Sequence, residues 1–171
     1  TGVGGADSIS QEPFSAMKFE DELVTISYNY STTASTYSLQ LYRQDHDKTL
    51  TFLIYIPNYG DAIRAKGVGP RFSANFDDVK SEGNFTIRDL RLSDNAVYYC
   101  GVRLDGGYGL TFGNGTRLTV EPERDSSEPS VYILPPYDSD TKNAACLATD
   151  YFPQNVSMVV AAGNKKQKQD N

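Results

Sequence analysis

The stretch RLSDNAVYYC, from Arg91 to Cys100, carries most of the information about the fold of this chain. Four of its residues occupy alternate positions: Asp94, Ala96, Tyr98 and Cys100. On a β-strand, residues at alternate positions point to one face. We therefore expect a strand here that turns Tyr98 and Cys100 to the interior, with Asp94 at the turn that precedes the strand.

Strand patterns recur along the rest of the chain, separated by clusters of Gly, Asn, Asp and Ser every ~8–12 residues. No stretch repeats apolar residues at helical spacing beyond one or two turns. The strand-like segments before the first break in composition are residues 23–28, 39–42, 49–56, 71–77, 84–90, 96–103 and 108–120. Such a series predicts an all-β sandwich of about nine short strands.

Two further motifs fit a sandwich. Arg71 opens one predicted strand at the same end as Asp94, and we expect a partly buried arginine–carboxylate pair to close that end. Residues 112–116 read Phe-Gly-Asn-Gly-Thr, and two glycines around one residue before a β-branched run predict a bulged edge strand. No helix pattern follows these glycines, which argues against a phosphate-binding loop.

Composition excludes several functions. The net charge of −6 and the absence of a basic stripe argue against nucleic-acid binding. The two cysteines fit neither a zinc site nor a redox motif, and we expect no metal or cofactor. His46, the only histidine, lies between Asp45 and Asp47 in a polar segment that predicts a solvated turn rather than a relay or a metal site. No nucleophile elbow is present, so we do not expect an enzyme.

The chain has no apolar run near the ~20 residues that a membrane span needs, and its first residues do not form a signal peptide. Asn-x-Ser/Thr glycosylation motifs are more frequent than chance predicts, which weakly favours the secretory route. The four motifs begin at Asn29, Asn84, Asn114 and Asn155.

A break in composition divides the chain. The segment EPERDSSEP (Glu121–Pro129) is charged and polar with proline near both ends, which is typical of a linker. We assign residues 1–121 to the first domain, 122–129 to the linker and 130–171 to a second, partial domain. The second part has strand patterns at 131–134, 144–149 and 156–160, too few to bury a full sandwich core. Its basic cluster at Lys165, Lys166 and Lys168 predicts a solvated tail.

The combination of DNAVYYC with FGNGTRLTV resembles an immunoglobulin variable domain that ends in a joining segment. SLQLYRQ and RFSAN fit an alpha-type variable segment of a T-cell receptor, and TVEP with PSVY and AACLATDYF resembles a receptor constant region of the alpha or delta type. The resemblance covers residues 6–120 and 129–160. It implies an immunoglobulin-like Greek-key sandwich followed by an incomplete constant-type domain, in which Cys146 stands for the first cysteine. It also implies a tyrosine corner, in which the Tyr98 phenol bonds back to the main chain.

The chain departs from this family at the centre of the core. The family pattern has a cysteine at position 28, bonded to Cys100, and a tryptophan at position 41; this chain has Tyr28 and Leu41. A bridge across this loop is worth roughly 4 kcal/mol in the entropy model, and a tryptophan-sized volume roughly 3 kcal/mol. We expect Tyr28 to fill the space and to need a partner for its hydroxyl. Cys100 would then be a buried free thiol, with a Cys100–Cys146 bond as the alternative.

Three loops at one end of the sandwich, residues 31–37, 57–62 and 101–111, are rich in Ser, Thr, Asn, Gly and Tyr, as binding loops are. The resemblance aligns them with the hypervariable loops of a receptor. The expected antigen-binding residues are Thr33, Ser35, Tyr37, Asn58, Tyr59, Arg103, Leu104, Asp105, Gly106, Gly107 and Tyr108. By the same resemblance, Arg103, Leu104, Asp105 and Tyr108 would face bound peptide, and Tyr37, Asn58 and Tyr59 would lean towards the presenting molecule.

A second surface follows from the strands. Tyr42, Gln44, Tyr99 and Phe112 should share one outward face, and the resemblance implies that this face packs on the variable domain of a beta-type partner chain. The expected protein is the extracellular part of a T-cell receptor alpha chain at the plasma membrane. It would bind peptide held by a histocompatibility molecule and assemble with invariant signalling subunits. A delta chain and a stand-alone adhesion or innate receptor domain are the alternatives.

Overall fold

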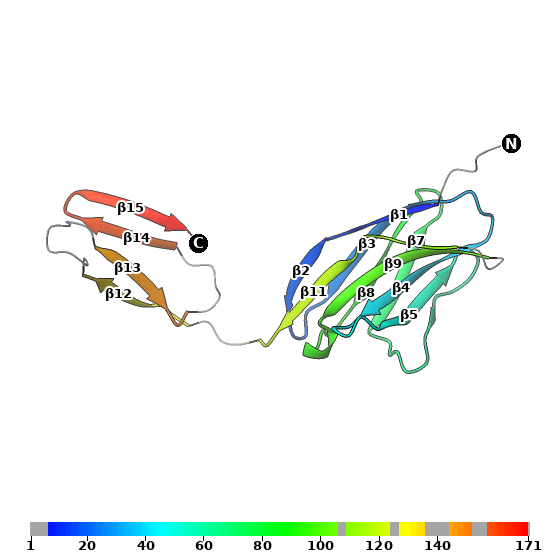
Figure 1. The fold of residues 1–171 in the computed structure, drawn as a ribbon, viewed down its shortest axis with the longest axis horizontal. Coiled ribbons are helices and arrows are strands. Elements are labelled where there is room, and N and C mark those ends of the chain that lie inside the picture. Colours follow the sequence, from blue (N-terminus) through cyan, green and yellow to red (C-terminus); the bar gives the residue numbers. More distant parts are fainter. Residues whose placement is uncertain (1–6, 106–108, 124–126, 136–143, 152–156, 171) are drawn as a thin grey trace. The chain divides into compact units, whose positions relative to one another are not determined.

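The computed structural model describes residues 7–105, 109–123, 127–135, 144–151 and 157–170, with residues 169 and 170 described by their backbone alone. The chain divides into two compact units, Thr1–Pro122 and Glu123–Asn171 (Figure 1), and each is considered by itself. Among the described residues the regular elements are strands and one 3₁₀ turn, η1 (Leu92–Asp94), so the predicted all-β class is confirmed. No helix in this part of the chain is long and apolar enough to cross a membrane.

The first unit is a sandwich of two sheets (Figure 1). The smaller sheet has the order β1-β3-β8-β7, with β1 (Ser8–Glu12), β3 (Val24–Ser31), β8 (Glu82–Ile87) and β7 (Phe72–Asp77). The larger has the order β2-β11-β9-β4-β5-β6, with β2 (Ser15–Phe19), β11 (Thr116–Glu121), β9 (Ala96–Leu104), β4 (Tyr37–Gln44), β5 (Leu50–Pro57) and β6 (Ile63–Arg64); β10 (Leu110–Phe112) pairs with β9. The prediction of about nine strands was too low because β1, β2 and β6 were missed.

The chain changes sheets between β1 and β2. β1 pairs antiparallel with β3, whereas β2 runs parallel to β11 in the opposite sheet. Pro13 stands between the two strands, and a residue without an N–H group cannot continue a ladder. Gln11 then ties the sheets together: its amide donates to the carbonyl of Tyr98 at 3.0 Å and to the hydroxyl of Thr116 at 2.9 Å, and accepts from the N–H of Cys100 at 2.9 Å.

The core lies between the sheets and follows the predicted alternation. In β3, Val24, Ile26, Tyr28 and Tyr30 are buried, and the residues between them are more exposed. In β9, Tyr98 and Cys100 are fully buried, as predicted. Leu41 and Cys100 are register partners on β4 and β9, so the missing tryptophan and the unbridged cysteine meet at one place.

Tyr28 fills the centre of this core. Its side chain is 1% exposed, and its ring centroid lies 5.3 Å from that of Phe85. Its hydroxyl donates to the backbone carbonyl of Asn75 at 3.1 Å, which provides the partner that a buried phenol needs. Burial raises the pKa of Tyr28 and that of the Cys100 thiol far above their ordinary values. Both cysteines are free, and Cys100 is fully buried inside the first unit, which argues against the Cys100–Cys146 alternative.

Gly83 makes room for the tyrosine. It is the register partner of Tyr28 on β8, and a Cβ placed there would lie 2.5 Å from the Tyr28 hydroxyl oxygen and 2.8 Å from the Cα of Phe76. Carbon atoms in contact normally lie ≈ 3.5–4.0 Å apart, so no side chain fits at this position. The large residue at 28 is therefore matched by the absence of a side chain at 83, which sequence reasoning did not identify.

The end of the sandwich is closed as predicted. Arg71 and Asp94 form a two-pronged ion pair, Nη1 to Oδ2 at 2.8 Å and Nη2 to Oδ1 at 3.1 Å. The Tyr98 hydroxyl donates to the Asp94 carbonyl at 2.7 Å, which is the expected tyrosine corner. Burial raises the pKa of the Asp94 carboxyl, but hydrogen bonds from Arg71 and from the Arg91 N–H outweigh it and hold that pKa below its usual value.

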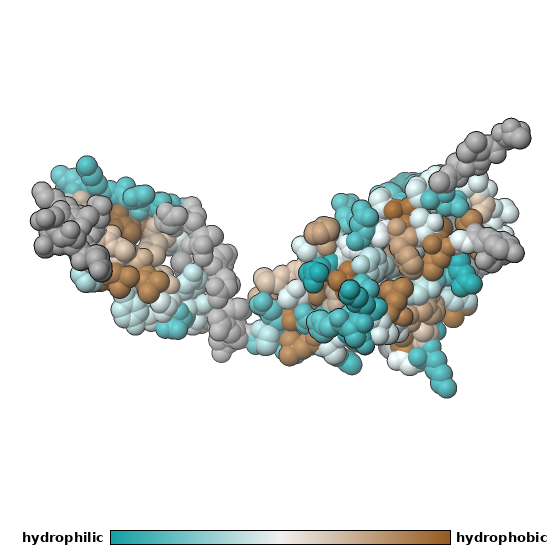
Figure 2. Space-filling model, in the orientation of Figure 1, coloured by the Kyte–Doolittle hydropathy of each residue, from teal (hydrophilic) through white to brown (hydrophobic). Residues whose placement is uncertain are grey.

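The second unit contains two hairpin-like pairs. β12 (Ser130–Leu134) pairs with β13 (Ala145–Thr149), and β14 (Ser157–Ala162) pairs with β15 (Lys165–Asp170). Lys165, Lys166 and Lys168 are exposed, as predicted, but they lie on β15 and not in a tail, because Gly163 adopts a positive φ of 62° and turns the chain back onto β14. Apolar side chains remain exposed on this unit (Figure 2), among them Ile133 at 75%.

Candidate binding surfaces

Three loops meet at one end of the first unit, and Asn58 joins two of them. Its side-chain oxygen accepts from the N–H of Tyr37 at 2.9 Å, and its side-chain nitrogen donates to the carbonyl of Ser35 at 2.9 Å. The N–H of Asp105, in the third loop, donates to the carbonyl of Thr36 at 3.1 Å. The segments 31–37, 57–62 and 101–105 are therefore held side by side by direct hydrogen bonds.

The exposed side chains of this end come from all three loops. Tyr59 is 76% exposed, and Thr33, Ser35, Arg103 and Asp105 are exposed as well. Leu104 is half-buried. Gly106, Gly107 and Tyr108 lie outside the described residues.

Tyr37 does not belong to this exposed set. Its side chain is only 8% exposed, its ring packs 5.4 Å from that of Tyr30, and the two hydroxyls are hydrogen-bonded at 2.8 Å. The prediction that Tyr37 contacts a ligand was wrong, because the residue begins β4 and turns into the core. Asn58 is half-buried with both amide atoms engaged, so it positions the loops.

An aromatic cluster lies on the outward side of the larger sheet. Tyr42 and Tyr99 are register partners on β4 and β9, and both pack against Phe112 edge to face, at 5.3 Å and 6.2 Å between ring centroids. The Tyr99 hydroxyl donates to the side-chain oxygen of Gln44 at 3.3 Å. The four residues predicted to share a face are therefore neighbours.

Two more rings extend the cluster, and sequence reasoning missed them. Phe52 lies 5.5 Å from Tyr42, and Tyr55 lies 5.8 Å from Phe52. A shift in the β4–β5 register opposite Leu41 and Tyr42 breaks the period of two, so that Phe52 and Tyr55 lie on one side while Leu53 and Ile54 turn inward. We call the five rings of Tyr42, Phe52, Tyr55, Tyr99 and Phe112 the aromatic face.

A concavity of about 360 Å³ connects the aromatic face with the third loop. Arg103, Leu104 and Asp105 line one side of it, and outward residues of β4 line its floor. A chain of hydrogen bonds runs along that floor: the Tyr42 hydroxyl donates to Gln40 at 2.8 Å, and the Gln40 amide donates to Ser38 at 3.1 Å. The loop end and the aromatic face thus form one continuous surface.

The Phe-Gly-Asn-Gly segment, residues 112–115, lies beside the aromatic face. Gly115 has a φ of +93°, and a Cβ there would lie 2.9 Å from the ring of Tyr99. Only glycine combines that backbone conformation with so close an approach. The Thr116 hydroxyl is fully buried and donates to the carbonyl of Pro13 at 2.6 Å, which fixes the start of β11.

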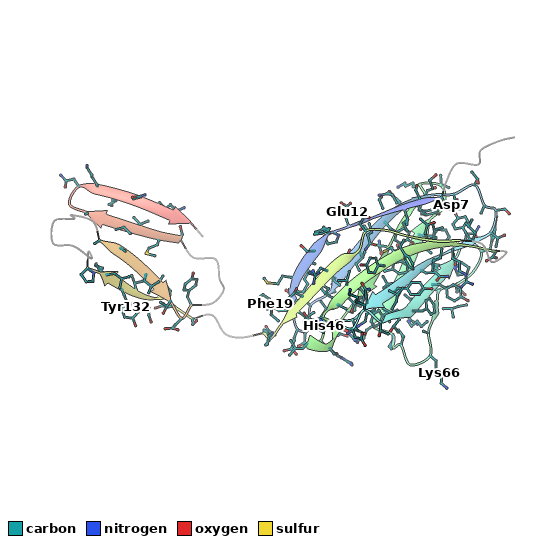
Figure 3. The ribbon with its side chains drawn as sticks, in the orientation of Figure 1. Asp7, Glu12, Phe19, His46, Lys66 and Tyr132 are labelled. Atoms are coloured by element: carbon teal, nitrogen blue, oxygen red, sulfur yellow. The ribbon has the colours of Figure 1, made fainter. Side chains whose placement is uncertain are left out.

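Sites for other chemistry are few. His46 lies exposed in the turn after β4 (Figure 3). Within the described ranges, no three His, Cys, Asp or Glu side chains are grouped so that they could hold a metal ion. Of the four glycosylation motifs, Asn29 and Asn84 lie on strands of the smaller sheet and Asn114 lies beside the aromatic face, while Asn155 falls outside the described residues.

A two-sheet sandwich closed by an Arg–Asp pair and a tyrosine corner, with three joined loops at one end, defines a variable-type immunoglobulin domain. Comparison with protein families agrees, since residues 9–121 match the immunoglobulin V-set domain.

Several individual relatives are T-cell receptor chains. The human (Homo sapiens) T cell receptor alpha chain MC.7.G5 is 33% identical over 153 residues, which are 89% of this chain and 54% of that protein. The human T cell receptor alpha variable 14/delta variable 4 is 32% identical over 60% of this chain and 85% of its own length. The mouse (Mus musculus) T-cell receptor alpha chain V region 2B4 is 32% identical over 70% of this chain and 87% of its own length.

The chain therefore belongs to the immunoglobulin V-set family and, within it, to the T-cell receptor alpha-type chains. The resemblance noted from the sequence is confirmed. Members of this family are not enzymes, which confirms the prediction of a non-catalytic protein. The chain spans about half (54%) of the length of the human alpha chain MC.7.G5.

Proposed function

We propose that this chain is the antigen-recognition chain of a T-cell receptor, which pairs with a beta-type chain and binds peptide held by a histocompatibility molecule. The observation that carries the proposal is the continuity of two surfaces. Loops joined through Asn58 and Asp105 lie at one end, and the aromatic face begins directly beside them. A receptor that binds its ligand with the loops of two paired domains needs its pairing surface directly beside its binding loops.

The aromatic face is the pairing surface in this proposal. Its five rings lie on the outer side of a sheet where an isolated domain would place polar residues. Aromatic side chains at the centre and polar groups at the rim are the usual composition of protein interfaces. The partner's variable domain would cover Tyr42, Tyr99 and Phe112, with the Gln44 amide at the edge.

The loop end is the ligand surface. Tyr59 and Arg103 are exposed, and such side chains frequently carry binding energy at interfaces. By the family resemblance, Arg103, Leu104 and Asp105 would face the peptide, and Thr33, Ser35 and Tyr59 the presenting molecule. The undescribed residues Gly106, Gly107 and Tyr108 belong to the same proposed loop.

The rest of the chain fits an extracellular receptor. The second unit would be part of a constant-type domain with Cys146 on its β13 strand, preceded by a linker at 122–129. In the complete receptor this part would lie outside the plasma membrane and assemble with invariant signalling subunits. A delta chain is the nearest alternative, because one relative carries both an alpha and a delta designation.

Pairing and recognition can be measured separately. The chain is produced with a beta-type and, in parallel, with a gamma-type partner, and complexes are measured by size-exclusion chromatography with light scattering. We expect a one-to-one heterodimer with the beta-type chain. A dimer with only the gamma-type chain would support the delta alternative, and a monomer with both would support a stand-alone receptor domain.

Recognition is then tested on receptor-deficient T cells that display the heterodimer, screened with a library of peptide–histocompatibility complexes. We expect selected complexes to stain these cells, and Tyr59→Ala to reduce staining at least tenfold. Leu92→Ala is the matched control, because Leu92 is 46% exposed in η1, just before the start of β9, whereas the binding loops lie at the other end of that strand. Equal loss in both variants, or no staining by any complex, would contradict the proposed ligand.

A further inference from the structure

The outward side of the smaller sheet differs from the aromatic face in composition. Thirteen outward positions on its four strands carry only polar or charged side chains: Ser8, Ser10 and Glu12; Thr25, Ser27, Asn29 and Ser31; Ser73, Asn75 and Asp77; Glu82, Asn84 and Thr86. Stable protein interfaces need apolar or aromatic anchors at their centre, and this sheet face has none. Its composition suits contact with water or with carbohydrate.

Two of the glycosylation motifs lie on this face, each within a strand. Because side chains alternate, the middle residues Tyr30 and Phe85 turn into the core, while each asparagine and its hydroxyl residue stay outside. Asn29 pairs with Glu82, and Ser27 pairs with Asn84, so the two asparagines are diagonal neighbours. Diagonal neighbours on adjacent strands are ≈ 7–8 Å apart.

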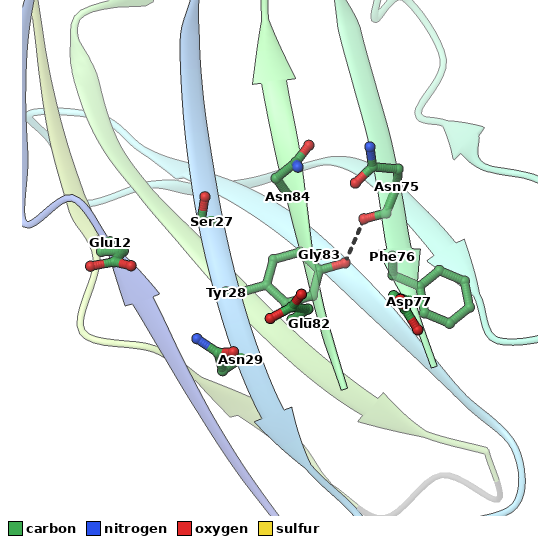
Figure 4. Close-up of a pocket in the computed structure, with 10 residues that line it drawn as sticks. All are labelled: Glu12, Ser27, Tyr28, Asn29, Asn75, Phe76, Asp77, Glu82, Gly83 and Asn84. Atoms are coloured by element: carbon green, nitrogen blue, oxygen red, sulfur yellow. Dashed lines mark hydrogen bonds between the residues drawn. The ribbon is translucent and has the colours of Figure 1, made fainter. Parts of the chain in front are cut away.

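Both asparagines also line one concavity of about 510 Å³ (Figure 4). Gly83, which leaves space for Tyr28 in the core, lies between the two outward residues Glu82 and Asn84 and contributes no side chain to the wall. Phe76 and Tyr28 also line the hollow, and Asn75 and Asp77 lie at the β7 side. The side chains around the two motifs thus leave room for a bulky group attached to either asparagine.

We propose that the outward side of the β1-β3-β8-β7 sheet is the glycan-bearing face of this domain, with Asn29 and Asn84 as its attachment points for N-linked carbohydrate. A glycan there solvates a large polar sheet surface and directs protein partners to the opposite sheet. The attachment points require only that the chain passes through the secretory pathway, whereas the contrast with Asn114 rests on the proposed pairing with a beta-type chain.

Asn114 provides the contrast. It has the same motif and is exposed, but it lies two residues after Phe112 and next to Gly115, whose backbone packs against the Tyr99 ring. A glycan at Asn114 would cover the aromatic face. In an assembled heterodimer this position remains unmodified.

Site occupancy tests the proposal directly. The full chain, given a secretion leader, is expressed in mammalian cells alone and with a beta-type partner. The purified protein is treated with PNGase F in ¹⁸O-labelled water, and the peptides are mapped by mass spectrometry. We expect ¹⁸O-labelled aspartate at positions 29 and 84, and none at 114 in the heterodimer. Label at only one of the two still places carbohydrate on this face; absence of label at both would overturn the proposal.

Matched variants confirm the assignment. Asn29→Gln and Asn84→Gln should each lower the intact mass by one glycan, and Asn114→Gln should leave the glycan mass unchanged. Ser31→Ala and Thr86→Ala remove the same two motifs and keep the asparagines, so they replace any glutamine variant that is not secreted. Because occupancy is measured on the chain alone as well, a failure to pair with a beta-type chain leaves this result interpretable. A glycan lost through Asn114→Gln in the heterodimer would contradict the division of faces.

Discussion

At position 28 a tyrosine occupies the place where the family has half of a disulfide. Its ring fills the core beside Phe85, and its hydroxyl is satisfied by the carbonyl of Asn75. The substitution works because Gly83, across the β3–β8 ladder, has no side chain to compete for the same space. Position 28 could be read from the sequence because the family pattern marks it. Position 83 could not, because nothing in a single strand reveals its cross-strand neighbour.

Substitution of Gly83 should therefore damage the core. Gly83→Ala places a methyl group against the Tyr28 hydroxyl and the Phe76 backbone, and we expect it to lower the free energy of unfolding by about 1–3 kcal/mol, as overpacking does. Chemical denaturation monitored by fluorescence measures the change. Gly69→Ala is the control, since no atom lies within 4 Å of a Cβ there. Equal stability of the two variants would show that Tyr28 adjusts freely.

The reactivity of the Cys100 thiol gives a second prediction at the scale of single residues. Burial raises the pKa of its thiol, so the reactive thiolate is suppressed while the domain is folded. We expect one thiol, that of Cys146, to react with an aromatic disulfide reagent in the native chain, and two in denaturant. In Cys146→Ser the native protein should not react at all. Rapid native reaction of that variant would mean that Cys100 is accessible.

At the scale of elements, the strands with the strongest alternation were predicted and the weakly patterned ones were not. β3 and β9 place apolar residues at every second position, which one sequence is enough to show. β1 was missed because Gln11, a polar residue, turns inward to bond Tyr98, Thr116 and Cys100. β15 has no apolar pattern and depends on its pairing with β14.

The residues of the binding surfaces, too, were predicted only where the strands alternate regularly. Tyr42, Gln44, Tyr99 and Phe112 could be placed on one face because β4 and β9 alternate regularly. Phe52 and Tyr55 were missed because the β4–β5 ladder contains an irregularity, and no sequence signal marks it. Tyr37 looked like a loop residue by composition, but its hydroxyl bonds to Tyr30 inside the sandwich.

The Arg71–Asp94 ion pair joins the start of β7 to η1, and we expect the stability of the domain to depend on it. Asp94→Asn leaves the Arg71 guanidinium partly buried without its counter-ion, and we expect a loss of about 3 kcal/mol in unfolding free energy. The pKa of Asp94 is lowered in the fold, so its ionised form stabilises the domain above the ordinary carboxyl pKa of about 3.9, and this contribution is lost as the pH falls through the folded value.

Unfolding measured from pH 7 down to about pH 2 checks this, because the Asn variant should lose less stability on acidification than the parent does. Asp61→Asn, an exposed change, is the control and should leave stability within about 0.5 kcal/mol of the parent. A parallel fall of the parent and Asp94→Asn at acid pH would assign the effect to other groups.

The aromatic face gives a prediction about pairing. Phe112→Asp places a carboxylate between Tyr42 and Tyr99, and a charge buried without a partner is costly at an interface. We expect a loss of at least 100-fold in affinity for the beta-type partner, measured by surface plasmon resonance, with an unchanged circular dichroism spectrum. Val79→Asp, on the β7–β8 turn, should pair normally. Normal pairing of Phe112→Asp would move the interface elsewhere.

At the scale of the whole molecule, the outer faces of the two sheets differ in composition. One sheet presents aromatic rings and the other presents only polar groups, while the joined loops occupy one end. Neither layer depends on the other through a covalent bond, since both cysteines are free. Packing and hydrogen bonds, including those of Gln11 and Tyr28, are the connections between and within the layers.

Reductant should therefore leave the first unit unaffected. We expect the midpoint of its thermal unfolding to agree within about 1 °C with and without excess dithiothreitol, whereas loss of a disulfide normally costs about 2–5 kcal/mol in a small secreted domain. Differential scanning calorimetry measures the midpoint. An alpha-type variable domain that has the usual cysteine pair is the comparison and should shift downward. A downward shift of this chain would reveal a cross-link between molecules.

The tyrosine at the centre of the sandwich has a practical consequence. The cytosol keeps thiols reduced, and proteins that rely on oxidised cysteines for stability are rarely found there. A recognition domain held by packing alone carries no such requirement. Its three loops would keep their geometry inside a living cell, where the scaffold can serve as an intracellular binder produced without oxidative folding machinery.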